Sequence, residues 1–222
     1  MKFSVIIPVL NEEAALKRLS SPRGADVELI IVDGGSRDGS LTLARKLADI
    51  ALRAPKAGRA AQMHQGALAA SGEILLFLHA DTALPRGWKQ TLEREWRAPS
   101  RPAATAFRLA FDAAGFRYRA IEALANFRNR LTRVPHGDQA ISVEARRYRD
   151  VGGFPDVPLM EEYFLLRKLK AHGIVRILPD AVKTSARRYE ANGALRNAAR
   201  NAFLLGLFYL GVPPRALARL YK

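Results

Sequence analysis

The sequence contains no cysteine, which excludes disulfide bonds and thiolate metal sites. Acidic residues are scarce beside basic ones, with 21 Asp and Glu against 36 Lys and Arg, so the formal net charge is +15. This charge favours anionic partners such as nucleotides, nucleic acids and acidic membranes, although a solvated basic surface explains it equally well. RNP motifs, zinc fingers and lysine-rich tails are also lacking. We therefore expect small anionic ligands and no nucleic acid.

Long hydrophobic runs are few. The stretch 202–212 is almost wholly apolar but falls short of the ~20 residues that span a bilayer. Four arginines flank it, Arg196, Arg200, Arg215 and Arg219. Three explanations of this segment remain, ranked from first to last: a core helix, a dimer face and an interfacial membrane helix. Residues 3–10 lack the features of a signal peptide, so we expect a buried strand there. The predicted location is the cytoplasm, with peripheral contact at the inner face of the membrane left open.

Hydrophobic residues make up 49% of the 222, which suffices for one well-buried α/β domain. The predicted strands are 3–10, 27–33, 49–54, 73–78, 103–111, 138–143, 174–178 and 182–185. The strand 103–111 is a candidate for the edge of the sheet. The predicted helices are 40–48, 58–70, 87–97, 115–130, 144–151, 161–172, 193–210 and 214–221. Strands and helices alternate over the first half, which predicts a doubly wound, mostly parallel sheet flanked by helices. We expect one domain over 1–190 and a helical extension over 191–222 packed on it.

Two segments, Val32–Gly39 and Phe77–Thr82, each run from an apolar strand into a turn of acidic and small residues. A parallel sheet brings such turns together at the carboxyl ends of its strands. There, Asp33 can accept a hydrogen bond from a nucleotide base. Asp81 can bind a divalent cation that neutralises a departing diphosphate. Each aspartate alone is also typical of an ordinary turn.

Five segments, in this order and spacing, resemble the family 2 glycosyltransferases of the GT-A fold: 5–13, 32–40, 58–66, 78–82 and 152–167. Within that family the chain most resembles small bacterial transferases encoded near radical-SAM and selenium-associated proteins. The resemblance implies a Rossmann-like sheet with a helical C-terminal extension. It also implies inverting transfer of a sugar from a nucleoside diphosphate sugar, preferably UDP-linked, with Mg²⁺ or Mn²⁺. The acceptor is an unidentified hydroxyl compound, and a lipid-linked one is left open.

The resemblance assigns roles position by position. The predicted donor-binding residues are Pro8, Asn11, Glu13, Asp33, Arg59, His79 and Asp81, with Asp81 also the metal ligand. Glu162 stands where the family's general base, usually aspartate, follows a glutamate. Residues predicted to face the donor sugar or the acceptor are Asp138, Gln139, Glu161 and Arg188. His79 departs from the family, which carries an acid there, so ribose binding, metal ligation and simple packing all stay open for it.

Simpler explanations exist for the individual residues, and rival functions exist for the chain. Adjacent acids such as Glu161 and Glu162 at a helix start also favour the helix dipole. A nucleotidyltransferase would favour a glycine- and arginine-rich loop after the first strand, where this chain has Asn11-Glu12-Glu13. A non-catalytic basic protein that binds nucleic acid or membrane is the second rival, and it would be indifferent to Asp33 and Asp81.

Overall fold

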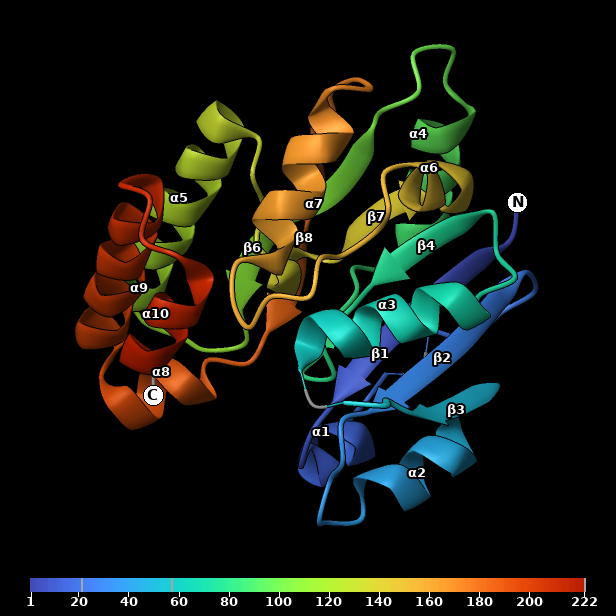
Figure 1. Ribbon diagram of the computed structural model, residues 1–222, viewed down its shortest axis with the longest axis horizontal. Helices are drawn as coiled ribbons and strands as arrows, with labels where there is room; N and C mark the ends of the chain where they lie inside the picture. Colours follow the sequence, from blue (N-terminus) through green and yellow to red (C-terminus); the bar gives the residue numbers. More distant parts are fainter. Residues whose placement is uncertain (21, 57, 222) are drawn as a thin grey trace.

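A computed structural model describes residues 1–20, 22–56 and 58–221 and shows one curled sheet between layers of helices (Figure 1). Within these ranges the sheet has eight strands in the order β3-β2-β1-β4-β7-β6-β8-β5. The strands are β1 (Phe3–Val9), β2 (Val27–Asp33), β3 (Ile50–Arg53), β4 (Ile74–Phe77), β5 (Thr82–Ala83), β6 (Ala104–Phe111), β7 (Ile141–Glu144) and β8 (Val175–Thr184).

Strands β1 to β4 form the parallel half of the sheet, as predicted. All seven residues of β1 are buried, as expected of a strand that helices cover on both faces. Helices α1 (Glu13–Lys17), α2 (Ser40–Leu47) and α4 (Trp88–Arg97) cover one face. Helices α3 (Arg59–Ala69), α6 (Ala145–Asp150) and α7 (Glu161–Lys170) cover the other. Gly66 lets α3 approach the sheet, because a Cβ there would lie 2.5 Å from Ile6 Cγ2.

The second half of the sheet differs from the sequence prediction in four places, one of which is the short strand β5, which was not predicted. The edge position for β6 is wrong, because β6 lies between β7 and β8. The two strands predicted at 174–178 and 182–185 are one strand, β8, whose register against β6 shifts around Pro179, where proline has no N–H to donate. The strand predicted at 138–143 begins only at Ile141, because residues 137–139 form a short 3₁₀ turn.

Four helices lie together beside the second half of the sheet (Figure 1). They are α5 (Phe116–Thr132), α8 (Arg187–Asn192), α9 (Ala194–Tyr209) and α10 (Pro214–Leu220), and α8 was not predicted. Helix α9 contacts α5, and its Phe208 ring packs 4.6 Å from that of Tyr163 on α7. In the described part of the chain, no helix combines the length and apolarity needed to cross a bilayer. The domain boundary at residue 190 stays a prediction.

Candidate functional site

The loops that follow β1 and β2 are joined by hydrogen bonds at the carboxyl end of the sheet. The backbone N–H of Asn11 donates to Ser36 Oγ at 2.9 Å, and Asn11 Oδ1 accepts from the backbone N–H of Arg37 at 2.9 Å. Asn11 adopts a left-handed φ of 54°, which asparagine tolerates better than most residues. The predicted site residue Asn11 therefore holds the two loops in register.

Glu13 makes a second connection between the same loops. Its Oε2 accepts from the backbone N–H of Gly39 at 2.9 Å, and its Oε1 lies 2.6 Å from Lys17 Nζ. The hydrogen bonds to Lys17 and Gly39 lower the pKa of Glu13 below its ordinary value. A Cβ at position 39 would lie 2.7 Å from the Glu13 carboxyl carbon, so this contact requires glycine.

Asp33 ends β2 with a side chain that is fully buried and already bonded to its own turn. Its Oδ2 accepts from the backbone N–H groups of Gly35 at 3.0 Å and Ser36 at 3.1 Å. Gly35 has a φ of 98°, which places it in the region that favours glycine. Asp33 shapes the turn in this structure, and its contact with a nucleotide base stays a prediction.

Gln62 is a residue that the sequence analysis missed. Gln62 lies on α3, and its Nε2 donates to the carbonyl oxygens of Val9 at 2.7 Å and Val32 at 2.8 Å. These two residues lie at the carboxyl ends of β1 and β2. A Cβ at Gly34 would lie 2.9 Å from the Gln62 amide. Gln62 thus fixes the spacing of the two strand ends. Pro8 lies in the same place, buried in β1 opposite Val32.

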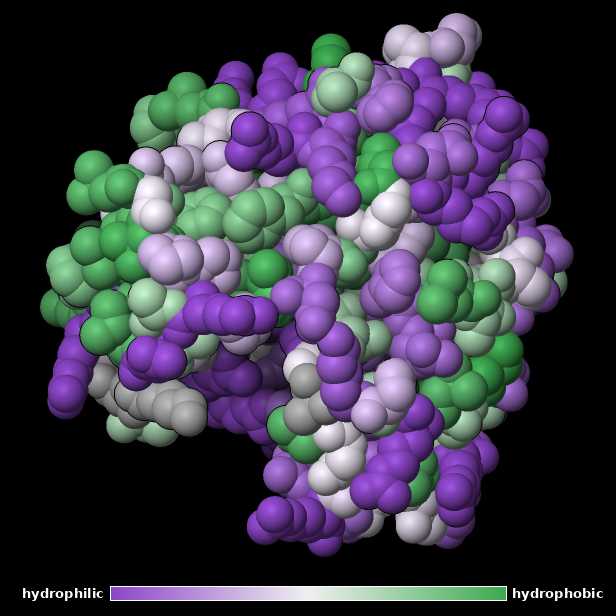
Figure 2. All heavy atoms as spheres, viewed as in Figure 1, coloured by the Kyte–Doolittle hydropathy of each residue, from purple (hydrophilic) through white to green (hydrophobic). Residues whose placement is uncertain are grey.

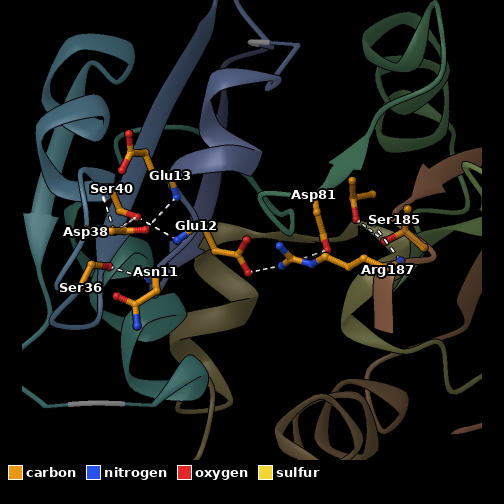
Figure 3. Close-up of polar contacts among 11 residues, drawn as sticks. Asn11, Glu12, Glu13, Ser36, Asp38, Ser40, Asp81, Ser185 and Arg187 are labelled. Atoms are coloured by element: carbon orange, nitrogen blue, oxygen red, sulfur yellow. Dashed lines mark hydrogen bonds and ion pairs between the residues drawn. The ribbon is translucent and has the colours of Figure 1, made fainter. Parts of the chain in front are cut away.

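Arg187 joins the β1 loop to the loop after β4 (Figure 3). Its guanidinium is hydrogen-bonded to Glu12 Oε1 and lies 3.5 Å from Asp81 Oδ2. The hydrogen bond to Glu12 raises the pKa of Arg187. The sequence analysis named the neighbouring Arg188, which is exposed, and its contact with the donor sugar or the acceptor stays a prediction. Both arginines belong to α8, and the first turn of that short helix directs Arg187 toward the carboxylates.

Arg59 joins the start of α3 to the start of α7. Its Nε lies 2.5 Å from Glu161 Oε1, and its Nη2 lies 3.4 Å from Glu162 Oε1. Burial opposes the charge of Arg59, but the carboxylates of Glu162 and Glu161 raise its pKa above the ordinary value. Arg59 therefore stays a fixed cation between two nearly buried glutamates.

Glu162 has the environment of a proton acceptor. Its side chain is 7% exposed, and burial together with the nearby Glu161 raises its pKa to about 7. Glu161 Oε2 is buried without a hydrogen-bond partner. A carboxyl group that titrates near neutral pH can take up a proton at a small free-energy cost, which suits a general base.

His79 and Gly137 lie beside the Glu162 carboxylate. A Cβ built on Gly137 would lie 2.2 Å from Glu162 Oε1 and 3.1 Å from His79 Nε2, so only glycine fits between them. Burial, Arg59 and Arg188 hold the pKa of His79 well below its ordinary value. His79 Nε2 is buried without a partner, so the neutral ring is free to hydrogen-bond a ligand.

Asp138 and Gln139 follow Gly137 but differ in function. Asp138 Oδ1 is buried without a partner, and burial raises the pKa of this carboxyl group. Gln139 instead uses its amide internally, because its Nε2 donates to Phe107 O at 2.9 Å and its Oε1 accepts from Asn129 Nδ2 at 2.6 Å. The neighbouring His136 is held neutral, because burial lowers its pKa to about 3.

The structure therefore groups the predicted residues into two sets. The loop set, with Asn11, Glu13 and Asp33, is held by internal hydrogen bonds. The second set surrounds the start of α7, with Arg59, His79, Asp138, Glu161 and Glu162. Asp81 is connected to the loop after β1 by Arg187, whose guanidinium pairs with both Asp81 and Glu12. Figure 2 shows a recess lined by hydrophilic residues between the α8–α10 side and the α1–α2 side of the molecule.

The family model for glycosyl transferase family 2 matches residues 4–149. An uncharacterized glycosyltransferase of Mycobacterium tuberculosis is 30% identical over 84 residues, which cover 38% of each chain. A PGL/p-HBAD biosynthesis glycosyltransferase of the same organism is 38% identical over 92 residues, which cover 37% of this chain and 36% of the relative. The chain thus matches little more than a third of the length of these relatives.

Solved structures share the fold over nearly the whole chain. The mannosyltransferase PcManGT of Pyrobaculum calidifontis, solved with GDP-Man and Mn²⁺, superposes with a TM-score of 0.67 at 19% identity, over 96% of this chain and 66% of that one. TarS of Staphylococcus aureus superposes with a TM-score of 0.65 at 16% identity, over 98% of this chain and 68% of that one. The GT-A architecture predicted from the sequence is thereby confirmed. The narrower resemblance to radical-SAM-associated transferases stays a prediction. Because the family model matches residues 4–149, well over half of the chain, the chain belongs to glycosyl transferase family 2.

Proposed function

We propose that the chain is an inverting glycosyltransferase that moves a sugar from a nucleoside diphosphate sugar, UDP-linked, to an acceptor hydroxyl. The observation that carries this proposal is a buried carboxylate beside the loop after β4, because Glu162 Oε1 and His79 Nε2 lie 2.2 and 3.1 Å from one Cβ position built on Gly137. Glu162 is a buried carboxylate with a pKa raised to about 7, and Asp81 is a carboxylate on the loop after β4. Membership in family 2 favours sugar transfer over nucleotide transfer.

Glu162 is the general base of the proposed reaction. As the acceptor oxygen forms a bond to the anomeric carbon of the sugar, the bond from that carbon to the diphosphate breaks. The acceptor proton passes to the Glu162 carboxylate, and the electron pair of the broken bond leaves with the nucleoside diphosphate. Attack opposite the leaving group inverts the anomeric configuration. Arg59 restrains the Glu162 carboxylate at 3.4 Å, which supports its positioning.

Asp81 is the residue that would hold a Mg²⁺ or Mn²⁺ ion. Among the described residues, no three His, Cys, Asp or Glu side chains are arranged to bind an ion by themselves. One carboxylate still fits such an ion when the substrate's phosphates complete its coordination, which is the usual arrangement for Mg²⁺. When bound, the ion would supply Lewis-acid stabilisation of the leaving diphosphate. A neighbour solved with GDP-Man and Mn²⁺ and another solved with UDP support this assignment.

Donor binding is tested by melting temperature, with nucleoside diphosphates and their sugars added with and without Mn²⁺. A ligand that binds the native state raises the melting temperature. We expect UDP to raise it most, Mn²⁺ to enlarge the shift, and Asp81→Ala to remove the Mn²⁺-dependent part. Asp150→Ala is the matched control, because Asp150 is exposed on α6. No shift with any nucleotide would contradict the proposal, and a full Mn²⁺ effect in Asp81→Ala would contradict the role of Asp81.

A further inference from the structure

Helix α5 carries its polar side chains inward. Asn126 Nδ2 donates to Leu109 O and Asn126 Oδ1 accepts from Leu109 N, each at 2.9 Å. Glu122 Oε1 accepts from the backbone N–H of Phe111 at 2.6 Å, and Asn129 bonds to Gln139. A helix on the surface of a globular protein normally turns its apolar side to the core. The inward side of α5 packs Tyr118, Ile121 and Ala125 into the core and also bonds to the polar backbone at the end of β6.

The outward side of α5 is apolar. Its exposed apolar residues follow the spacing i, i+4, i+8, i+11, i+15, which places them on one face. They are Phe116, Ala120, Leu124, Phe127 and Leu131. Phe116 is 87% exposed, and Leu124, Phe127 and Leu131 are each at least 61% exposed. Helix α5 therefore exposes four large apolar side chains that the fold leaves uncovered, which indicates an apolar environment on its outer side.

Helix α9, which contacts α5, repeats the same pattern. Its exposed residues with the identical spacing are Leu195, Ala199, Phe203, Gly206 and Leu210. Leu195 is 75%, Phe203 62% and Leu210 83% exposed, whereas Leu204 on the other side is buried. Figure 2 shows hydrophobic groups along the edge that α5 and α9 occupy in Figure 1. We call these two stripes together the α5–α9 face.

The exposed charges on helices α5 and α9 are of one sign, whereas the exposed acids Asp112 and Glu190 lie on the segments before them. Between residues 116 and 133 the one acid is Glu122, which is buried, and residues 194–222 contain no acid at all. The exposed cations of α5, α9, their ends and the following α10 are Arg117, Arg119, Arg130, Arg133, Arg196, Arg215 and Arg219. An apolar face whose own helices carry only cations as exposed charges matches the boundary of a bilayer that contains anionic lipids.

We propose that the α5–α9 face docks the protein on an anionic lipid bilayer. The apolar stripes enter the boundary between headgroups and acyl chains, and the arginines contact the lipid phosphates. A second copy of the chain fits less well, because a twofold contact would place this face against itself and bring the two arginine sets together. The inference concerns where the protein binds, so it does not rest on the proposed transfer reaction.

Co-sedimentation of the full chain with vesicles tests the docking. We expect binding to phosphatidylcholine vesicles that contain about 30% phosphatidylglycerol, weak binding to phosphatidylcholine alone, and release by salt. The double variant Phe127→Ser with Phe203→Ser should bind about tenfold more weakly, since it removes two exposed rings but no charge. Leu68→Ser is the matched control, because Leu68 is equally exposed, at 61%, but lies on α3. Circular dichroism and melting temperature verify that each variant folds.

Three outcomes would overturn the docking proposal. The first is unchanged vesicle binding by the folded double variant. The second is equal binding of the wild type to neutral and anionic vesicles. The third is a wild-type dimer, measured by light scattering, that the double variant abolishes while vesicles bind neither protein. That last result would assign the α5–α9 face to a second copy. Binding to anionic vesicles that depends on Phe127 and Phe203, but not on Leu68, supports the proposal.

Discussion

The turn after β2 and the start of α7 both place carboxylates at the edge of the sheet, but the two regions use them in opposite ways. Asp33 accepts two backbone N–H groups of its own turn, and Glu13 accepts one from Gly39. At α7, by contrast, Glu161 Oε2 and Asp138 Oδ1 are buried with no hydrogen-bond partner. The fold therefore occupies the carboxylates of Asp33 and Glu13, whereas Glu161 and Asp138 each keep an oxygen that can still accept a hydrogen bond, as does Glu12 through its buried Oε2.

This difference indicates that the two regions have different roles in the reaction. A turn held by internal hydrogen bonds is rigid before any ligand arrives, so it loses little entropy when one binds. A buried polar atom without a partner costs about 1–3 kcal/mol, and native proteins tolerate that cost mainly where function requires it. We infer that the β2 turn shapes the donor side, whereas the α7 region carries out the chemistry.

The largest expected effect comes from Glu162→Gln. Glutamine keeps the shape of the side chain but cannot take up the proton of the substrate hydroxyl group. We expect the transfer rate to fall by about 10²- to 10⁴-fold, the usual contribution of a positioned general base. Donor binding should stay near the wild-type level, because Arg59 keeps its contact with Glu161 at 2.5 Å. Single-turnover transfer and UDP calorimetry on the same preparation separate the two effects.

The pH dependence is the control for that variant. Glu162 must be ionised to act as a base, so kcat/KM of the wild type should rise with pH until the pKa of about 7 is passed. The free energy of unfolding should instead fall as the pH rises. The pKa of Glu162 in the folded state lies above its ordinary value of 4.5, so the folded state binds more protons between pH 4.5 and 7 and loses stability as the pH rises through this range. Glu162→Gln should therefore be the more stable protein above pH 7. A variant with wild-type turnover would contradict the assignment.

Gly137→Ala tests the packing of the α7 region without touching a charge. The new Cβ would lie 2.2 Å from Glu162 Oε1, so the carboxylate must move. Displacement of a catalytic group by about 1 Å can cost about 10²-fold in rate, and we expect a loss of that order in kcat. The matched control is Gly24→Ala, whose Cβ would meet only Val27 Cγ2, at 4.0 Å. Equal activity of the two variants would show that the Glu162 position is unimportant.

The parallel half of the fold could be predicted because its signals are local. β2 begins and ends at the predicted residues, and β1 differs by one residue, since each is a continuous apolar run closed by a polar turn. The signals for β6 and β8 were weaker. Whether β6 is an edge or an inner strand depends on which strand pairs beside it, and that partner, β8, lies far along the chain.

The candidate site was predictable as a set of residue types but not as a set of contacts. The acids Asp81, Glu161 and Glu162 stand at motif positions, so the sequence finds them. Arg187 carries no such signal, because its contact with Glu12 joins residues 175 positions apart. The adjacent Arg188 has the same chemistry, and only the direction of the α8 turn distinguishes the two. Burial of Glu162, which raises its pKa, likewise results from long-range packing.

Arg187→Ala gives the smallest expected effect and probes the boundary between the two regions. The Arg187 guanidinium lies 3.5 Å from Asp81 Oδ2, so it competes with a divalent cation for that carboxylate. Partly exposed ion pairs are worth up to about 1 kcal/mol, so UDP binding should need about two- to fivefold less Mn²⁺ in the variant. The advantage should shrink as salt screens the wild-type pair.

Calorimetric titration of Mn²⁺ at fixed UDP measures the change, with Arg146→Ala as the matched control, because the Arg146 side chain is 86% exposed on α6. If Arg187→Ala instead weakens UDP binding, Arg187 contacts the diphosphate and belongs to the donor side. The boundary between the two regions would then lie beyond α8. If neither constant changes, the guanidinium does not influence Asp81, and the bridge seen in Figure 3 only fixes the position of α8.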